Sequence, residues 1–186
     1  MPNRVIGYQK GACSRRRSAT AAAGLLLSAI VALATSSPAA AQDVGLPMGA
    51  VPERVQLEDL DGNTFDFAGV VGQKPVLMVF WATWCPLCAA LEPHIRAARQ
   101  EHGEALEILI VAVGVNQSPR SIRRHIQKHT PSGRLLFDAR GHAARAYRAP
   151  TTSYVVALDA QGRVVYTGVG DEQDIGAAAA KAVGSR

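Results

Sequence analysis

Two cysteines separated by two residues are the side chains of this sequence best suited to chemistry. Cys85 and Cys88 lie in the stretch FWATWCPLC, behind a run of bulky apolar residues. Such a pair can serve as a metal clamp, as a structural disulfide or as a redox centre in which a thiolate attacks a disulfide. The loop between them is so short that a disulfide there removes little entropy from the unfolded chain, which argues against a purely structural bond.

A strand and a helix are predicted on either side of the first cysteine. The run PVLMVFWA (residues 75–82) is continuously apolar, which is typical of a strand buried on both faces of a sheet. Residues 86–101 carry apolar side chains at helical spacing, and Pro86 suits a first helical turn. Cys85 then lies at a helix N-terminus, where unpaired amides and the helix dipole stabilise a thiolate. Cys88 lies one turn further on the same face, where it can resolve a mixed disulfide.

The residues that flank the cysteines predict a surface for a partner. Trp84 would supply an apolar lip beside Cys85, and Pro86 would make the turn rigid. A second feature is the stretch YRAPTTSYVV, in which Pro150 precedes a predicted strand. An X-Pro bond tolerates the cis form, but the residues alone favour an ordinary trans proline in a loop.

A metal site is the main alternative to a redox centre. A closed zinc site needs four ligands, and the sequence has one CxxC and no second pair. His125 and His129 are four residues apart and would share a helix face. They are surrounded by basic residues, so we expect a solvated basic face there. A copper-carrying module that uses Cys85, Cys88 and a distant histidine stays open. We expect no resident metal and no cofactor.

The remaining patterns predict an α/β fold with a mixed sheet. A hairpin is expected at 55–67, around Asp61 and Gly62, and a second at 153–168. Further strands are expected at 106–115 and 134–137, and further helices at 118–129, 141–147 and 171–183. Pro93 should kink the helix that follows the cysteines. This order implies a central mixed β-sheet flanked by helices on both faces, with an N-terminal β-hairpin extension.

The first 41 residues read as a signal peptide. Five basic and no acidic residues precede Gln42, which leaves 15 basic against 15 acidic residues in the rest of the 186-residue chain. Because the chain from Gln42 onward has no net charge, it does not show the excess of basic residues that is typical of a nucleic-acid-binding domain. Arg15–Arg17 precede an apolar run at 19–34, and a small-residue motif ends at Ala41. A retained membrane anchor is the alternative, although this run is shorter than the roughly 20 residues of a membrane span.

Three parts of the chain are therefore expected: a signal peptide at 1–41, an extended lead-in at 42–52 and one domain at 53–186. The mature protein would be periplasmic or otherwise extracytoplasmic, and soluble after cleavage. Its cysteines would then be Cys85 and Cys88, in a compartment where thiols and disulfides interconvert.

The combination of these motifs resembles the thioredoxin superfamily, in its extracytoplasmic branch with TlpA, ResA and the cytochrome c maturation thioredoxins. The similar stretches are KPVLMVFWATWCPLC (74–88), Pro93, residues 135–170 and the hairpin before the active-site strand. The resemblance implies a thioredoxin fold. It also implies that Cys85 attacks, that Cys88 resolves and that Pro150 is a cis-proline beside the disulfide. Ala149 would offer its backbone to an extended substrate, with Thr151 beside it.

The sequence departs from this family at two acidic positions. Thioredoxins carry an acidic residue six positions before the first cysteine, where this chain has Val79. The ResA branch carries a glutamate two positions before the helix proline, where this chain has Leu91. Glu92 is one position, or about 100°, further round the helix, so we expect it to face solvent rather than the cysteines. The usual proton acceptor for Cys88 would then be missing, or replaced by water or by a backbone group.

The expected function is an extracytoplasmic thiol:disulfide oxidoreductase that acts on protein cysteines. The resemblance favours a reductant for apocytochrome or metallochaperone cysteines, supplied with electrons by a membrane thiol partner. A disulfide-forming oxidant is the alternative, because the residues between the cysteines tune the potential. A thiol peroxidase is disfavoured, since its motif requires proline and threonine where this chain has Met78 and Ala82.

Overall fold

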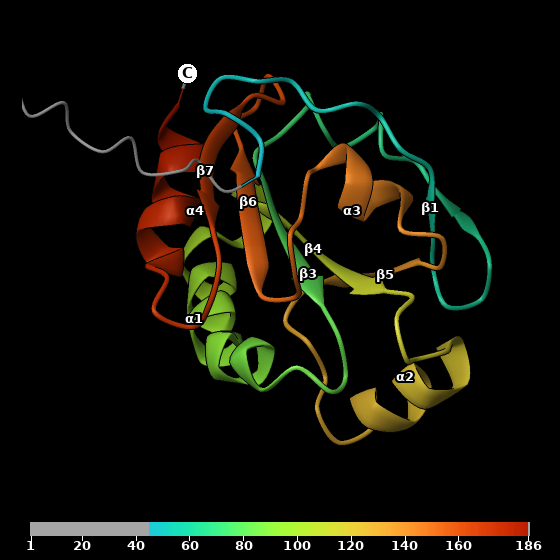
Figure 1. The fold of residues 1–186 in the computed structure, drawn as a ribbon. Coiled ribbons are helices and arrows are strands. Elements are labelled where there is room, and N and C mark those ends of the chain that lie inside the picture. The colour runs from blue at the N-terminus through green and yellow to red at the C-terminus, as the bar shows by residue number, and fades with distance from the viewer. Residues whose placement is uncertain (1–44, 186) are drawn as a thin grey trace, which may run out of the picture. The chain divides into compact units, whose positions relative to one another are not determined.

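A seven-stranded mixed sheet organises residues 45–185, the part of the chain that the computed structural model describes (Figure 1). The strands follow the order β2-β1-β5-β4-β3-β6-β7. β3 is parallel to β4, and β4 is parallel to β5, whereas the outer pairs are antiparallel. The strands are β1 Leu57–Glu58, β2 Thr64–Phe65, β3 Val76–Trp81, β4 Glu107–Val113, β5 Arg134–Asp138, β6 Tyr154–Leu158 and β7 Val164–Gly168. The helices are α1 Pro86–His102, a 3₁₀ turn Gly103–Ala105, α2 Pro119–Ile126, α3 His142–Ala146 and α4 Ile175–Gly184.

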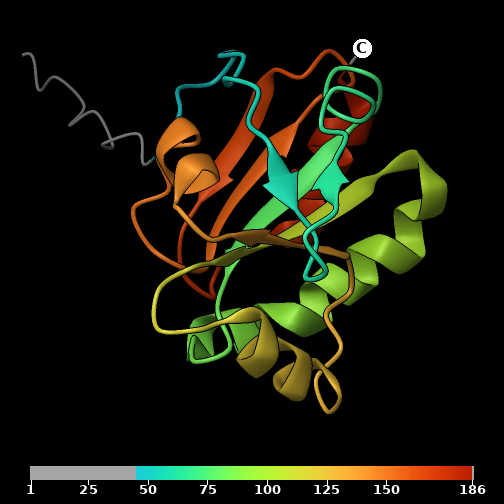
Figure 2. The same ribbon diagram turned by 90° about the vertical axis from the view of Figure 1, so that its right-hand side faces the viewer.

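Strand β3 pairs with β4 and β6 along its two edges, and it is buried on both faces because a core packs on each side of the sheet. Its alternate residues enter two separate cores. Leu77 and Val79 join the core that contains buried residues of α1, α2 and α4. Met78 and Phe80 join the opposite core, which contains α3 and the segments before β3. Helices therefore cover both faces of the sheet, as the sequence predicted (Figure 2).

The predicted N-terminal hairpin is present as the short pair β1 and β2. Leu57 pairs with Phe65, and Gly62 in the turn has a φ of 86°, which suits glycine. β1 also pairs antiparallel with β5 through Glu58 and Phe137. The hairpin thus extends the edge of the sheet beyond β5.

Two helix boundaries differ from the predicted ones by three residues or more. The last helix was expected from residue 171 but begins at Ile175, because the Asp174 side chain caps it by accepting the N–H of Ala177 at 2.8 Å. α2 ends at Ile126, three residues before the predicted end. α1 runs through Pro93 without interruption to its C-cap at Gly103.

The described part of the lead-in, residues 45–52, runs without helix or strand. It pairs with the start of β7, where Gly49 N–H donates to Val164 O at 2.7 Å and Val164 N–H donates to Ala50 O at 2.9 Å. The expected signal peptide at 1–41 lies outside the described residues. Among residues 45–185, no helix has the length and apolar character needed to cross a membrane.

Candidate active site

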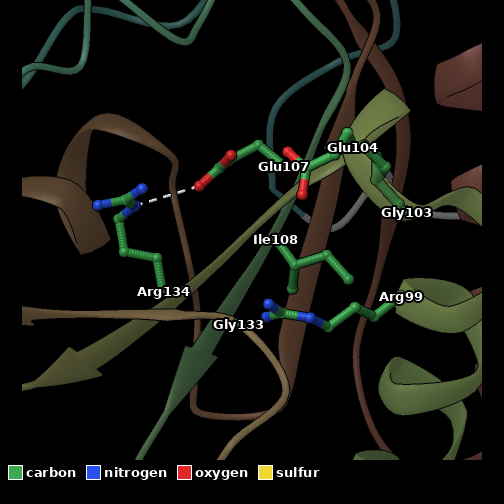
Figure 3. A pocket seen from close by; sticks show the side chains of 8 residues that line it. Arg99, Gly103, Glu104, Glu107, Ile108, Gly133 and Arg134 are labelled. Carbon is green, nitrogen blue, oxygen red and sulfur yellow. Dashed lines mark hydrogen bonds and ion pairs between the residues drawn. The ribbon is translucent and has the colours of Figure 1, made fainter.

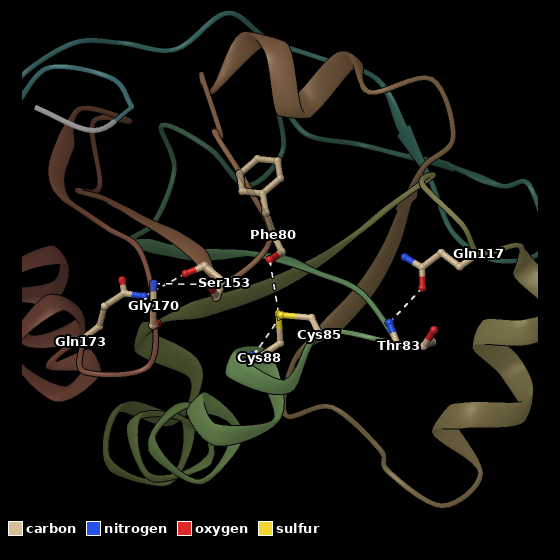
Figure 4. Close-up of a disulfide and its surroundings, with 8 residues drawn as sticks. All are labelled: Phe80, Thr83, Cys85, Cys88, Gln117, Ser153, Gly170 and Gln173. Carbon is tan, nitrogen blue, oxygen red and sulfur yellow. Dashed lines mark hydrogen bonds between the residues drawn. A yellow bond between two sulfur atoms is a disulfide. The ribbon is translucent and has the colours of Figure 1, made fainter.

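The cysteine pair lies where the central strand β3 passes into α1. Cys85 is the N-cap of α1 and Cys88 lies in its first turn, and their sulfur atoms form a disulfide (Figure 4). The N–H of Cys88 donates to the sulfur of Cys85 at 3.1 Å. Pro86 takes the first helical position, where a missing N–H leaves no bond unmade. The strand and helix predicted around these cysteines are therefore the ones that position them.

The local electrostatics favour a thiolate on Cys85. A thiolate at this N-cap would accept the amide of Cys88 and would face the positive end of the helix dipole. The first turn of α1 contains no acidic residue that would oppose this. Both effects lower the pKa of a thiol and raise the fraction of the nucleophilic form.

The sulfur of Cys88 is enclosed. Cys88 is only 2% exposed, and its sulfur lies 3.9 Å from the carbonyl oxygen of Phe80, which can accept the thiol proton as a hydrogen bond after reduction. The same oxygen accepts the N–H of Ser153 at 2.8 Å. Figure 4 shows Ser153 and Cys88 on the two sides of this oxygen.

Ser153 is a site residue that sequence reasoning missed. It is completely buried and has a φ of 62°, which non-glycine residues seldom adopt. Its hydroxyl accepts the N–H of Gly170 at 3.3 Å, and its carbonyl accepts Nε2 of Gln173 at 2.9 Å. No local pattern signals such a position, because the bonds that hold it come from β3 and from the loop before α4.

The loop before Cys85 is held by two further contacts. Thr83 N–H donates to the side-chain oxygen of Gln117 at 3.0 Å (Figure 4), and Trp84 Nε1 donates to Val115 O at 2.9 Å. Gln117 was also missed, because its partner is 34 positions away in the chain. These bonds connect the loop after β4 to the cysteine turn and fix the direction in which Trp84 projects.

Exposed apolar side chains gather around the cysteine turn. Trp84 is 47% exposed and Leu87 is 41% exposed, and they flank Cys85. Val115, the partner of Trp84, and Val169, next to Gly170, are exposed as well. Large apolar groups left in water beside a reactive pair favour contact with another macromolecule.

Four of the five predicted substrate-binding residues line one groove, and Pro86 is not among its lining residues. Ala149, Pro150 and Thr151 line a groove of about 460 Å³ together with Trp84, and Cys85 and Cys88 are not among its lining residues. The expected cis bond at Pro150 is wrong, since no peptide bond among residues 45–185 is cis. The trans form is the default for X-Pro, and the loop turns instead through positive φ values at Arg148 and Ser153.

A second pocket, which we call the cysteine pocket, borders both sulfur-bearing residues. It measures about 360 Å³, and its lining residues are Trp81, Ala82, Thr83, Cys85, Cys88, Ala89, Glu92, Arg96, His125, Lys128, His129, Thr130 and Pro131. Its walls come from the end of β3, from α1 and from α2 with the residues that follow it. This pocket contains most of the ionisable groups near the disulfide.

Glu92 does not point away from the cysteines as expected. It lines the cysteine pocket, and its side chain is 22% exposed. One carboxylate oxygen accepts the hydroxyl of Ser132 at 2.6 Å and lies 3.7 Å from Nη2 of Arg96. Glu92 is four residues after Cys88, so the two share a helix flank, and Ser132 draws the carboxylate toward the loop before β5.

His125 is not part of the solvated face that the sequence suggested, whereas His129 is exposed as expected. The His125 ring lies edge-on to the Trp81 ring, with 5.5 Å between centroids, and 4.9 Å from the His129 ring. His125 is half-buried, and both histidines line the cysteine pocket. Burial, and then the charge of His129, lower the pKa of His125 below its ordinary value of 6.5.

A third pocket carries charge but no nucleophile. Glu107 is its central acid (Figure 3), with Lys74 at 2.7 Å and Arg134 at 3.2 Å from its carboxylate oxygens. Burial raises the pKa of Glu107, but the hydrogen bonds and charges of the two cations outweigh it and hold the pKa below its usual range. The arrangement gives a half-buried acid at the start of β4 two cationic partners.

Comparison with known proteins gives one consistent relationship. The chain is 28% identical over 119 residues to the thiol-disulfide oxidoreductase ResA of Halalkalibacterium halodurans, which covers 63% of this chain and 66% of that protein. It is 30% identical over 139 residues to the thiol:disulfide interchange protein DsbE of Yersinia pestis, which covers 70% of this chain and 66% of that protein. The chain thus spans slightly less than two thirds of each relative.

The fold has close structural counterparts. A secreted disulfide oxidoreductase of Mycobacterium tuberculosis, described as homologous to DsbE of E. coli, superposes with a TM-score of 0.58 at 23% identity. The match covers 68% of this chain and 94% of that one, so the thioredoxin-like fold expected from the sequence is confirmed. The family model described as Redoxin matches residues 35–183, and the chain belongs to the Redoxin family.

Proposed function

We propose that this protein is an extracytoplasmic thiol:disulfide oxidoreductase that acts on cysteines of other proteins and works chiefly as a reductant. The observation that carries the proposal is the Cys85–Cys88 disulfide at the N-terminus of α1, with Cys85 as N-cap. This is the geometry in which the first thiol is activated and the second can resolve a mixed disulfide. The names of the ResA and DsbE relatives support the same class of reaction.

A protein substrate fits the surroundings of the pair. The apolar side chains of Trp84, Leu87 and Val115 are exposed beside it, and the groove with Ala149, Pro150 and Thr151 lies next to Trp84. An extended substrate segment would lie against these residues and present its cysteine to Cys85. In the reducing direction, electrons would come from a membrane thiol:disulfide partner, and the clients would be apocytochrome or metallochaperone cysteines.

Oxidation is a second candidate that one observation favours. Arg96 and Lys128 line the cysteine pocket, and Val79 and Leu91, where related proteins carry acids, are fully buried apolar residues. Cations beside the pair stabilise a thiolate, and a stabilised reduced form makes a stronger oxidant. Glu92, which lines the same pocket 3.7 Å from Arg96, opposes part of this effect. The copper module has less support, since residues 45–185 contain no group of three His, Cys, Asp or Glu side chains that could hold a metal ion.

The reduction potential of the pair decides between these directions. We expect a value near or below that of thioredoxin, about −270 mV, after equilibration of the full chain against glutathione or dithiothreitol buffers. A value near −120 mV, typical of a strong oxidant, would overturn the reductant proposal. A Cys88→Ser variant should trap substrate proteins on Cys85 from a periplasmic extract, and the matched Cys85→Ser variant should not. No trapped protein with Cys88→Ser would count against protein substrates altogether.

A further inference from the structure

The cysteine pocket must do more than expose the disulfide, because exchange at this pair requires a proton to move. When Cys85 is joined to a substrate, the thiol of Cys88 has to lose its proton before its sulfur can attack. Cys88 is 2% exposed, and the neighbour of its sulfur is the carbonyl oxygen of Phe80, which accepts a hydrogen bond but takes up no proton. A base must therefore be reached through the pocket that borders Cys88.

The ionisable groups that face this pocket are few. α1 contributes Glu92 and Arg96, α2 contributes His125, and the residues after α2 contribute Lys128 and His129. Arg96 and Lys128 offer hydrogen-bond donors and no acceptor, so they are not candidates for the base. The choice is therefore between Glu92 and the two histidines.

Glu92 is committed to a structural contact. The oxygen that accepts the Ser132 hydroxyl at 2.6 Å is also the one that faces Arg96 at 3.7 Å. The bond to Ser132 connects α1 to the loop before β5. Ser132 and Arg96 together hold the carboxylate of Glu92 in place. Its protonation would weaken both interactions.

His125 is placed differently. Its ring is half-buried and packs edge-on against the Trp81 ring. Trp81 and His125 both line the pocket that Cys85 and Cys88 border. Among residues 45–185, no hydrogen bond engages its ring nitrogens. Its lowered pKa, caused by burial and by His129, keeps the imidazole neutral at pH 7, in the form that accepts a proton. His129 is exposed, so its ring is less restricted.

We infer that His125 is the base that exchanges the thiol proton of Cys88 through the cysteine pocket. The transfer is direct or through one water molecule, for which a pocket of about 360 Å³ has room. This role rests on the proposed thiol:disulfide exchange and explains how exchange proceeds without acids at positions 79 and 91. His125 thus takes the place of a carboxylate, from α2 rather than from β3 or α1.

The resolving step balances as follows. Neutral His125 takes the proton of Cys88, and the resulting thiolate attacks the sulfur of Cys85 in the mixed disulfide. The Cys85–Cys88 bond forms, the Cys85–substrate bond breaks, and its electron pair leaves on the substrate sulfur. That thiolate takes a proton from the imidazolium or from solvent. The cysteine pair has then lost two electrons, and the substrate disulfide has gained two electrons and two protons.

An aromatic disulfide that releases a coloured thiol separates the two steps. In single turnover, the reduced full chain releases one equivalent when Cys85 attacks and a second when Cys88 resolves. We expect His125→Gln to slow the second release at pH 7 at least 10-fold and to leave the first within about twofold. The pH profile of the second release should lose its inflection below pH 6.5, and added imidazole should restore part of the rate.

Matched variants make the result specific. His142→Gln removes an exposed histidine on α3 and should behave as the wild type. Equal slowing of both releases by His125→Gln would indicate a structural role and would overturn the inference. A larger loss of the second release in Glu92→Gln than in His125→Gln would assign the proton to Glu92 instead. Failure of Cys85 to release even the first equivalent in the wild type would contradict the proposed function itself, which is a separate outcome.

Discussion

Ser153 and Phe80 are joined by a 2.8 Å hydrogen bond from the N–H of the first to the carbonyl oxygen of the second. That oxygen also lies 3.9 Å from the sulfur of Cys88. The backbone of Ser153 therefore helps to orient the group that a reduced Cys88 would bind. Ser153 is itself held from the other side by Gln173, whose Nε2 donates to its carbonyl oxygen at 2.9 Å.

Replacement of Gln173 by alanine should loosen this arrangement. Gln173 Nε2 also donates to Gly170 O at 2.6 Å, and its Oε1 accepts the hydroxyl of Tyr166 at 3.2 Å. Gln173→Ala leaves these half-buried groups without their partner, and we expect the free energy of unfolding to fall by about 1–3 kcal/mol. Urea unfolding of the oxidised protein measures this. Gln161→Ala, at an exposed turn position, is the control, and an equal loss in both variants would refute the explanation.

Replacement of Trp84 by alanine should separate protein substrates from small ones. Trp84 lines the groove beside Cys85 and is 47% exposed, so it is free to bury its ring against a partner. Aromatic anchors of this kind contribute about 2 kcal/mol or more to an interface, which corresponds to more than 10-fold in kcat/KM for a protein disulfide. The rate with a small aromatic disulfide should change much less.

The control for this experiment is Met48→Ala, which removes an exposed apolar side chain that does not line the groove. We expect it to leave both rates unchanged. An equal loss of both rates in Trp84→Ala would mean that the tryptophan acts on Cys85 and not on the partner.

Most of the fold was predictable because the signals are local. The apolar run at 75–82 became β3, a central strand with a hydrophobic core on each face. The position of Cys85 at a helix N-terminus followed from that strand and from Pro86. The hairpin around Gly62 was predicted from its turn residues, Asp61 and Gly62. Each inference used neighbours within a few positions of the chain.

The features that were missed depend on contacts across the fold. The bond between Glu92 and Ser132 spans 40 positions, and it turned an expected surface acid into a wall of the cysteine pocket. The edge-on packing of His125 against Trp81 placed one residue of the expected basic helix face in the pocket that borders the disulfide. Ser153 took its position through bonds to two other segments, β3 and the loop before α4. Such contacts have no signature in sequence spacing.

Removal of the Tyr147 hydroxyl should stabilise the protein. The ring is fully buried, with centroids 6.0 Å from Phe80 and 6.2 Å from Phe67, but its hydroxyl has no hydrogen-bond partner among the described residues. Burial also raises the pKa of this phenol, so it stays neutral. Tyr147→Phe keeps the ring packing and removes an unpaired polar atom, so we expect a gain of about 1 kcal/mol in the free energy of unfolding.

Tyr154→Phe provides the contrast for this prediction. Tyr154 is equally buried, but its hydroxyl accepts the N–H of Leu46 at 3.4 Å. Its removal should therefore be neutral or destabilising. If chemical unfolding shows that both variants lose stability, then the Tyr147 hydroxyl has a partner in solution and the prediction is wrong.

The last prediction concerns the dependence of stability on pH. Burial and His129 lower the pKa of His125 in the folded state. As the pH falls, the unfolded chain therefore takes up a proton on this imidazole near pH 6.5, whereas the folded chain takes it up only at a lower pH. Above that pH, both states carry a neutral imidazole and His125 contributes nothing. As the pH falls through 6.5, the free energy of unfolding should drop, until the folded state also takes up the proton. Urea unfolding of the oxidised protein at pH 7.5 and 5.5 should show a smaller drop for His125→Gln than for the wild type, whereas His142→Gln should keep the full drop. Equal drops in all three proteins would mean that His125 is as well solvated in the folded state as in the unfolded one, and would remove the basis for a neutral base beside Cys88.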